Sequence, residues 1–69
     1  MTLTDHKKAT GKTWARIAAE LSECALARDA DRINRILEGR VYSLVAGKRA
    51  KSWEVLALAD YLGEGATYN

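Results

Sequence analysis

Two groups of basic residues are the strongest candidates for a binding site in this sequence. Arg28, Arg32 and Arg35 stand at positions i, i+4 and i+7, so they would share one face of a helix. The second group lies between Gly39 and Lys51, where there is no acidic residue, and comprises Arg40, Lys48, Arg49 and Lys51, with Tyr42 and Ser43 between them. Cations in a loop can hold phosphate oxygens, whereas arginine on a rigid helix can direct a bidentate fork at guanine.

The distribution of charge favours contact with a polyanion over plain solvation. Asp31 could pair with Arg35 and stabilise an isolated helix by about 0.2–0.5 kcal/mol, so a charged helix face alone proves little. However, residues 1–51 hold eleven basic and six acidic residues, a net charge of +5, whereas residues 52–69 hold three acids and no base. A basic body with an acidic C-terminal end suits one face held against a polyanion.

Other motifs give no catalytic, metal or cofactor site. The stretch ATGKT at 9–13 ends like a phosphate-binding loop, but His6 stands where that motif needs its first glycine, and no strand leads in. Neither His6 nor Cys24 has partners at ligand spacing, and no serine, histidine and acid trio is present. We expect a protein that is not an enzyme and uses no cofactor or metal. The lone cysteine, polar start and lack of a long apolar run predict a cytoplasmic protein with no membrane contact.

The composition and the apolar spacing predict an all-α chain. Alanine, leucine and arginine are abundant and proline is absent, which favours helices. A short first helix, capped by Thr4 or Asp5, should stop near Gly11. Thr13 should cap a second helix, whose apolar stripe consists of Trp14, Ile17, Ala18 and Leu21.

A third helix is expected over residues 25–38, after a break near residues 22–25. Its apolar face would be formed by Leu26, Ala30, Ile33 and Leu37. Gly39 would end this helix, because glycine commonly follows the last helical residue. The three arginines of the first basic group would lie on another face of the same helix.

Two shorter elements complete the predicted fold. RVYSLVA at 40–46 indicates a brief fourth helix that ends at Gly47; a strand is the alternative, but it would have no partner. Ser52 should cap a last helix that ends at Gly63, with an inner stripe of Val55, Leu58, Ala59 and Leu62.

These elements predict a single domain over residues 1–69, a compact bundle of about five short helices with residues 64–69 as a tail. The expected core consists of Trp14, Ile17, Leu21, Ile33, Leu37, Leu44, Leu58 and Leu62. A domain of this size buries only about 60% of the surface that its unfolded chain exposes, so self-association is also expected.

The order of these parts resembles the lambda-repressor-like helix-turn-helix family of phage repressors, Cro proteins and XRE-type regulators. LTDHKKATGKTWARIAAEL at 3–21 is similar to the opening of that domain, with a basic first helix ending in glycine and a Thr-led second helix. GKRAKSWEVLALADYLG at 47–63 is similar to its end, a Gly-Lys-Arg loop followed by a Ser-capped helix. The ends also resemble the N-terminal helical domain of cyanases, which implies no cyanase activity because the catalytic domain lies outside the resemblance.

The resemblance implies a recognition helix in the major groove of DNA, and two segments fit that role. In the family this helix begins a few residues after the position of Leu21, and one Gly-Lys-Arg loop follows it. Here both Gly39-Arg40 and Gly47-Lys48-Arg49 look like that loop. Bases would be contacted either by residues 25–38, through Arg28, Arg32 and Arg35, or by residues 39–46, through Arg40, Tyr42 and Ser43.

We therefore expect a sequence-specific DNA-binding transcriptional regulator that acts by occupying an operator. Its partners would be double-stranded DNA and a second copy of the chain, joined through Tyr61, Leu62 and the tail. The expected DNA contacts are Thr13, Arg28, Arg32, Arg35, Arg40, Tyr42, Ser43, Lys48, Arg49 and Lys51. The alternative is a small helical protein-interaction module, an adaptor, inhibitor or subunit, that keeps the fold and binds a protein partner instead of DNA.

Overall fold

Four α-helices make up the part of the chain that the computed structural model describes, residues 1–28 and 35–69. They are α1 (Leu3–Thr10), α2 (Trp14–Arg28), α3 (Glu38–Val45) and α4 (Ser52–Leu62). No strand occurs within these residues, so the all-α class is confirmed, although four helices stand where five were expected. Within the same residues, no helix has the length and apolar character needed to cross a bilayer.

The first helix begins and ends on local capping signals. Thr2 is its cap, not Thr4 or Asp5 as predicted. The Thr2 hydroxyl accepts a hydrogen bond from the Asp5 amide (3.1 Å), and the Asp5 carboxylate accepts one from the Thr2 amide (3.4 Å), which forms a capping box. The predicted stop at Gly11 is confirmed: its φ is 71°, in the left-handed region, and its amide donates to the carbonyl of Lys7 (2.9 Å).

The long helix α2 replaces two of the expected elements. Thr13 caps it as predicted, because its hydroxyl accepts from the Arg16 amide (3.2 Å) and its carbonyl accepts from the Ile17 amide (3.0 Å). The predicted break near residues 22–25 is wrong, since the helix runs on to Arg28. Ser22 lies within the helix, where its hydroxyl donates to the carbonyl of Ala18 (2.8 Å). The helix predicted over residues 25–38 is not found as a separate element in the described part of the chain, because residues 25–28 belong to α2 and residues 35–37 are not helical. The middle of that prediction, residues 29–34, lies outside the described residues.

In the segment that leads into α3, Ile36 faces the core in place of the predicted Leu37. Leu37, expected in the core, is 62% exposed, and Leu26 is 38% exposed, whereas Ile36 is buried. The reason is Ser22, whose hydroxyl accepts from the Ile36 amide (2.9 Å) and lies 3.1 Å from the Ile36 carbonyl oxygen, which fixes that residue against α2. Ala30 and Ile33 lie outside the described residues.

The ends of α3 and α4 combine two corrections with two confirmed predictions. Gly39 does not end a helix but lies in the first turn of α3 with a negative φ, because the chain enters that helix only at Glu38. Gly47, with φ 108°, follows the end of α3, and Gly63, with φ 100°, follows the end of α4, both as predicted. The cap residue of α4 is Lys51 rather than Ser52, which is the first helical residue.

The inner face of α4 also differs in one position from the predicted stripe. Val55 is 51% exposed, and its neighbour Glu54 occupies the buried place instead. Leu58 is buried as predicted, while Ala59 and Leu62 are half-buried. A charged residue can replace valine on the inner side here because Arg40 of α3 meets its carboxylate.

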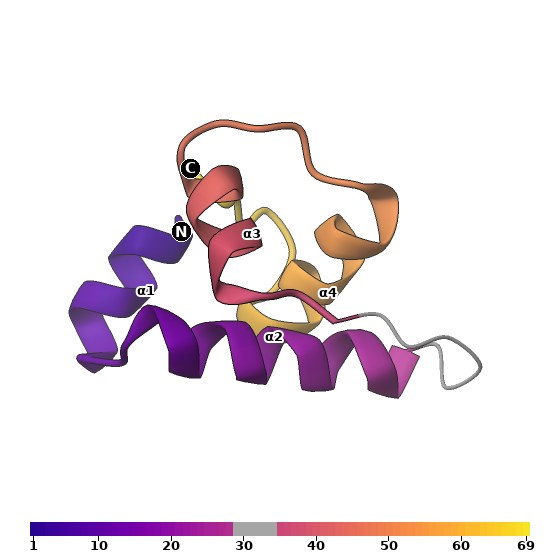
Figure 1. The fold of residues 1–69 in the computed structure, drawn as a ribbon, viewed down its shortest axis with the longest axis horizontal. Helices are drawn as coiled ribbons and strands as arrows, with labels where there is room; N and C mark the ends of the chain where they lie inside the picture. Colours follow the sequence, from indigo (N-terminus) through magenta and orange to yellow (C-terminus); the bar gives the residue numbers. More distant parts are fainter. Residues whose placement is uncertain (29–34) are drawn as a thin grey trace.

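Helices α3 and α4 both pack on α2, and α1 lies beyond the N-terminal end of α2 (Figure 1). Four of the predicted core residues, Ile17, Leu21, Leu44 and Leu58, are buried at their meeting point. Trp14 and Leu62 pack against this cluster while half-buried. The core also contains Leu3, Ala18, Ala25, Ile36, Val41, Ala57 and Tyr68.

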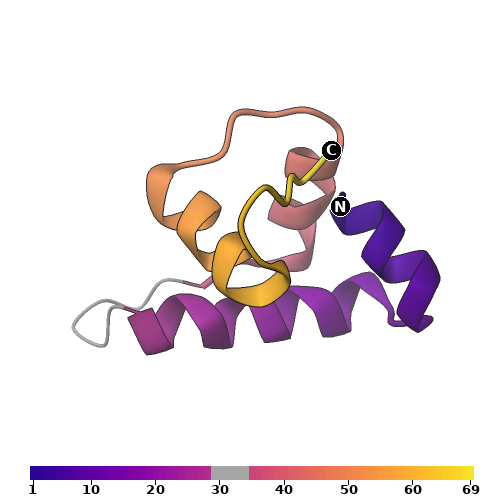
Figure 2. The same cartoon turned by 180° about the vertical axis from the view of Figure 1, so that it is seen from behind.

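The C-terminal segment is part of the fold, not the free tail that was expected. It crosses from the end of α4 to the first residues of the chain (Figure 2). There the Leu3 amide donates to the carbonyl of Thr67 (3.0 Å), and the Thr67 amide donates to the carbonyl of Met1 (3.1 Å). Tyr68 is buried, and its hydroxyl donates to the carbonyl of Glu54 (2.7 Å). Residues 64–69 thus cover α4 and the start of α1.

Candidate nucleic-acid interface

The structure separates the ten predicted contact residues into three groups. Thr13 is exposed at the start of α2, and Tyr42 and Ser43 lie on α3. The basic loop, residues 46–51 between α3 and α4, carries Lys48, Arg49 and Lys51, all three exposed. Of the remaining four, Arg40 faces inward, Arg35 lies before α3, and Arg32 and the side chain of Arg28 lie outside the described residues.

The outer side of α3 meets the start of α2 through two aromatic rings. Tyr42 is 49% exposed, and its ring lies edge-on to that of Trp14 with centroids 6.2 Å apart. The Tyr42 hydroxyl donates to the carboxylate of Glu38 (2.6 Å), which raises the pKa of the tyrosine. Ser43 is held more closely to the helix, because its hydroxyl donates to the carbonyl of Gly39 (3.2 Å).

Sequence reasoning missed a cation on the same side of the molecule. The ammonium of Lys7, on α1, lies 5.4 Å from the centre of the Trp14 ring, within cation–π range. Trp14 had been assigned to the core, yet its half-buried ring links α1 to α3. The spacing of Lys7 and Trp14 along the chain gives no signal for this contact, because Gly11 redirects the chain between them.

The Arg40 side chain does not point outward as predicted, but toward Glu54 on α4. Its Nε lies 2.8 Å from Glu54 Oε2 and its Nη2 lies 2.7 Å from Oε1, so the guanidinium holds both carboxylate oxygens. The Glu54 side chain is 1% exposed and that of Arg40 is 28% exposed. A buried carboxylate requires such a partner, so the first role of Arg40 is to balance the charge of Glu54 within the fold.

The same ion pair braces the basic loop from two directions. Arg40 Nη2 donates to the carbonyl of Arg49 (3.3 Å), and Glu54 Oε1 accepts from the amide of Lys51 (2.7 Å). Because both bonds hold main-chain atoms, the side chains of Arg49 and Lys51 stay in solvent. Glu54 could have been found from the sequence, since a glutamate at the third position of a helix often accepts from the residue before that helix.

The ionisation of the pair follows from these contacts. Burial acts to raise the pKa of Glu54, but the hydrogen bonds from Arg40 and from the Lys51 amide outweigh it, so the pKa lies below its ordinary value. The hydrogen bond to Glu54 raises the pKa of Arg40. Both groups are therefore charged at neutral pH, and the guanidinium charge is neutralised inside the protein.

A second glutamate, Glu20 on α2, gathers cations on another part of the surface. Its carboxylate oxygens lie 2.8 Å from Lys12 Nζ and 3.2 Å from Arg16 Nε. Tyr61 of α4 also donates to it, so the phenol oxygen is free to accept from His6 Nε2, 3.0 Å away. The bonds from Lys12, Tyr61 and Arg16 lower the pKa of Glu20 to about 2. The predicted dimer contact at Tyr61 is thus occupied within the chain.

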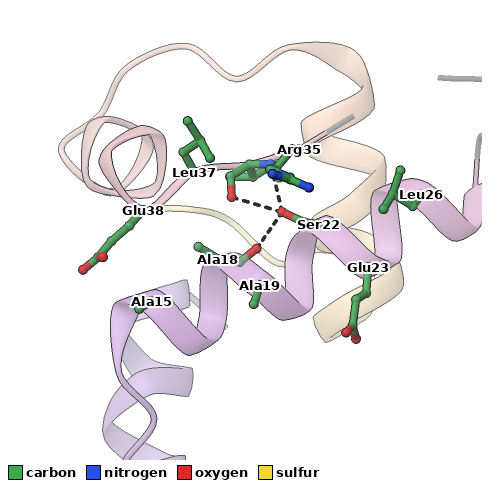
Figure 3. A pocket seen from close by; sticks show the side chains of 10 residues that line it. Ala15, Ala18, Ala19, Ser22, Glu23, Leu26, Arg35, Leu37 and Glu38 are labelled. Carbon is green, nitrogen blue, oxygen red and sulfur yellow. Dashed lines mark hydrogen bonds between the residues drawn. The ribbon is translucent and has the colours of Figure 1, made fainter. Parts of the chain in front are cut away.

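Arg35 lies beside a hollow that we call the α2 groove (Figure 3). The groove has a volume of about 420 Å³. It is lined along α2 and along the segment that enters α3 by Ala15, Ala18, Ala19, Ser22, Glu23, Leu26, Arg35, Ile36, Leu37 and Glu38. Its surface is mainly apolar, which sets it apart from the basic loop.

No described residues form a group of three histidine, cysteine or acidic side chains that could hold a metal ion. No family model, no curated protein and no solved structure matches this chain. Two features of the described surface could bind another molecule. They are the exposed cations beside the short helix α3 and the apolar groove on α2.

Proposed function

We propose that this chain is a DNA-binding regulator of the lambda-repressor-like kind, with α3 as the helix that enters the major groove. The observation that supports this most is the basic loop, in which three exposed cations follow directly on α3. Arg40 and Glu54 hold the main chain of this loop at Arg49 and Lys51, and the Lys48 amide donates to the carbonyl of Ser43 (3.0 Å). A braced loop presents its cations to phosphate oxygens without having to order first, which lowers the cost of binding.

The side chains available on α3 suit the reading of base edges. Tyr42 and Ser43 are uncharged hydrogen-bonding groups, and Glu38, in the first turn, could accept from the amino group of cytosine. Lys7 and the exposed Thr13 at the start of α2 would then hold phosphates on the other flank of α3. We leave Arg40 out of the proposed contacts, because its guanidinium is neutralised by Glu54.

The proposal predicts a salt-dependent affinity for duplex DNA. Fluorescence anisotropy with a labelled generic duplex, at several salt concentrations, should show binding that weakens as salt rises. Replacing Lys48 by Ala should reduce the slope of log affinity against log salt by about one, since one phosphate contact is lost. The matched control is Lys12→Gln, which removes the same charge from an ammonium already paired with Glu20.

Two results would reject the proposal. An equal loss for Lys48→Ala and Lys12→Gln would indicate that net charge alone attracts DNA. The absence of binding even at low salt would favour the second function, a helical protein-interaction module. The observation that favours this second function is the α2 groove, where Leu37 and Leu26 remain exposed beside an alanine floor.

A further inference from the structure

Apart from Glu38, which stands on its rim, the residues that line the α2 groove are not among the proposed DNA contacts, and the groove has the features of a docking surface. Its floor is a stripe of three alanines on α2, and large apolar side chains stand at its edges, Leu37 at 62% and Leu26 at 38% exposure. Exposed leucines beside a hollow favour burial against another molecule, because apolar surface is removed from water.

The groove is already formed in the single chain. Its walls are held together by the buried Ser22 hydroxyl, which accepts from the Ile36 amide (2.9 Å) and bonds to the Ala18 carbonyl (2.8 Å). Ile36 is 1% exposed, so the backbone that carries Leu37 is anchored on both sides. Leu37 therefore projects from a fixed position and would lose little freedom on docking.

Charges of both signs stand on the rim. Figure 3 shows Glu38 toward one end of the groove and Glu23 toward the other, with Arg35 between them. All three side chains are exposed. Glu38 already accepts the Tyr42 hydroxyl, which leaves Glu23 as the acid better placed to meet an outside cation.

We propose that the occupant of the α2 groove is a second copy of this chain, related to the first by a two-fold axis. An isologous interface requires one patch that is complementary to itself. This patch offers an apolar projection, Leu37, beside an apolar hollow, and a cation, Arg35, beside an acid, Glu23. In the dimer, Leu37 of each copy covers the alanine floor of the other, and Arg35 of each copy faces Glu23 of the other.

This surface replaces the dimer contact expected from the sequence. Tyr61 already bonds to Glu20 and His6, and residues 64–69 pack back onto the start of the chain, so the polar groups there are used within one copy. A partner with only one sign of charge would be repelled by part of the rim, whereas a second copy supplies the opposite charge at each position.

The first experiment measures the mass of the free chain by sedimentation equilibrium over a range of concentrations, without DNA. A concentration-dependent dimer is expected. Leu37→Glu should weaken it by about a hundred- to ten-thousandfold, because the substitution removes one buried leucine from each copy and so two from every dimer. Val55→Glu is the matched control, because Val55 is 51% exposed on α4, outside the groove, and this variant should dimerise normally.

The second experiment tests the pairing of charges between copies. Arg35→Glu alone and Glu23→Arg alone should each oppose dimerisation, because like charges then meet twice across the axis. A mixture of the two variants should form a mixed dimer, since every such contact then joins opposite charges. Three results would each overturn the proposal: a monomeric native chain, a dimer unaffected by Leu37→Glu, or a mixture that fails to associate. A monomeric native chain would favour a different protein as the occupant of the groove.

Discussion

Two glutamates in this small domain gather donors in the same way and in different surroundings. Glu54 on α4 is 1% exposed and holds Arg40 of α3 through two short bonds, whereas Glu20 on α2 is 23% exposed and holds Lys12 and Arg16 near solvent. Water and salt weaken attraction at the exposed site, while the buried carboxylate depends on its partner to remain charged. Similar contacts can therefore contribute differently to the free energy of unfolding, and burial decides which of them the fold requires.

The largest difference in stability between the two sites should come from Glu54→Gln. The variant keeps the shape of the side chain but removes the charge that balances Arg40, so the free energy of unfolding should fall by about 3 kcal/mol. Urea unfolding followed by circular dichroism measures this loss. Glu20→Gln serves as the matched control and should cost far less. Equal losses for the two variants would contradict the role assigned to burial.

A smaller effect is expected from Tyr68, the buried residue near the end of the chain that bonds to the main chain of Glu54. Tyr68→Phe removes the hydroxyl that donates to the Glu54 carbonyl but keeps the buried ring. The free energy of unfolding should fall by about 1 kcal/mol, as for a typical hydrogen bond. Thr67→Val, which removes an exposed hydroxyl that donates to the Asn69 carbonyl (2.7 Å), is the control for a hydrogen bond lost near solvent in the same urea experiment. An unchanged midpoint for Tyr68→Phe would mean that its hydroxyl adds nothing.

Acid should weaken both sites, and the variants separate their shares. The folded state lowers the pKa of Glu20 from 4.5 to about 2, so its carboxylate contributes stability that is present above about pH 4.5 and is lost as the pH falls toward 2. The pKa of Glu54 is also lowered, so its contribution has the same sign. In unfolding measurements over this range, Glu20→Gln should give a shallower decline than the native chain. Parallel curves would contradict the lowered pKa.

The smallest difference should appear on adding salt. Lys12 and Arg16 are 30% and 68% exposed, so salt screens their attraction to Glu20 more than the bonds within the buried pair. The cost of Glu20→Gln should therefore shrink at about 1 M sodium chloride, where the screening length is near 3 Å, while the cost of Glu54→Gln stays nearly the same. A loss at Glu54 that vanished in salt would place this pair in the same class as the exposed one.

The proposed DNA surface depends on the same buried pair. Arg40 was predicted to contact DNA because it is basic and lies in a segment without acids, yet its partner Glu54 is fourteen positions further along the chain. Composition and spacing reveal cations but not the acids that fold against them. The three cations of the basic loop were correctly predicted to be at the surface, because a short loop between two helices is solvated.

Local signals in the sequence correctly predicted the all-α class, the cap of α2 at Thr13, the stops at Gly11 and Gly63, and the burial of Ile17, Leu21, Leu44 and Leu58. These follow from local rules of capping and helical spacing, which act within a few residues. The tertiary structure was needed to show that α2 continues through Ser22 and that Ile36 rather than Leu37 faces inward. It was also needed to show that Arg40 and Tyr68 bond to Glu54. The position of Ile36 and the contacts of Arg40 and Tyr68 each depend on a partner fourteen residues away in the chain, and no local spacing encodes such a contact.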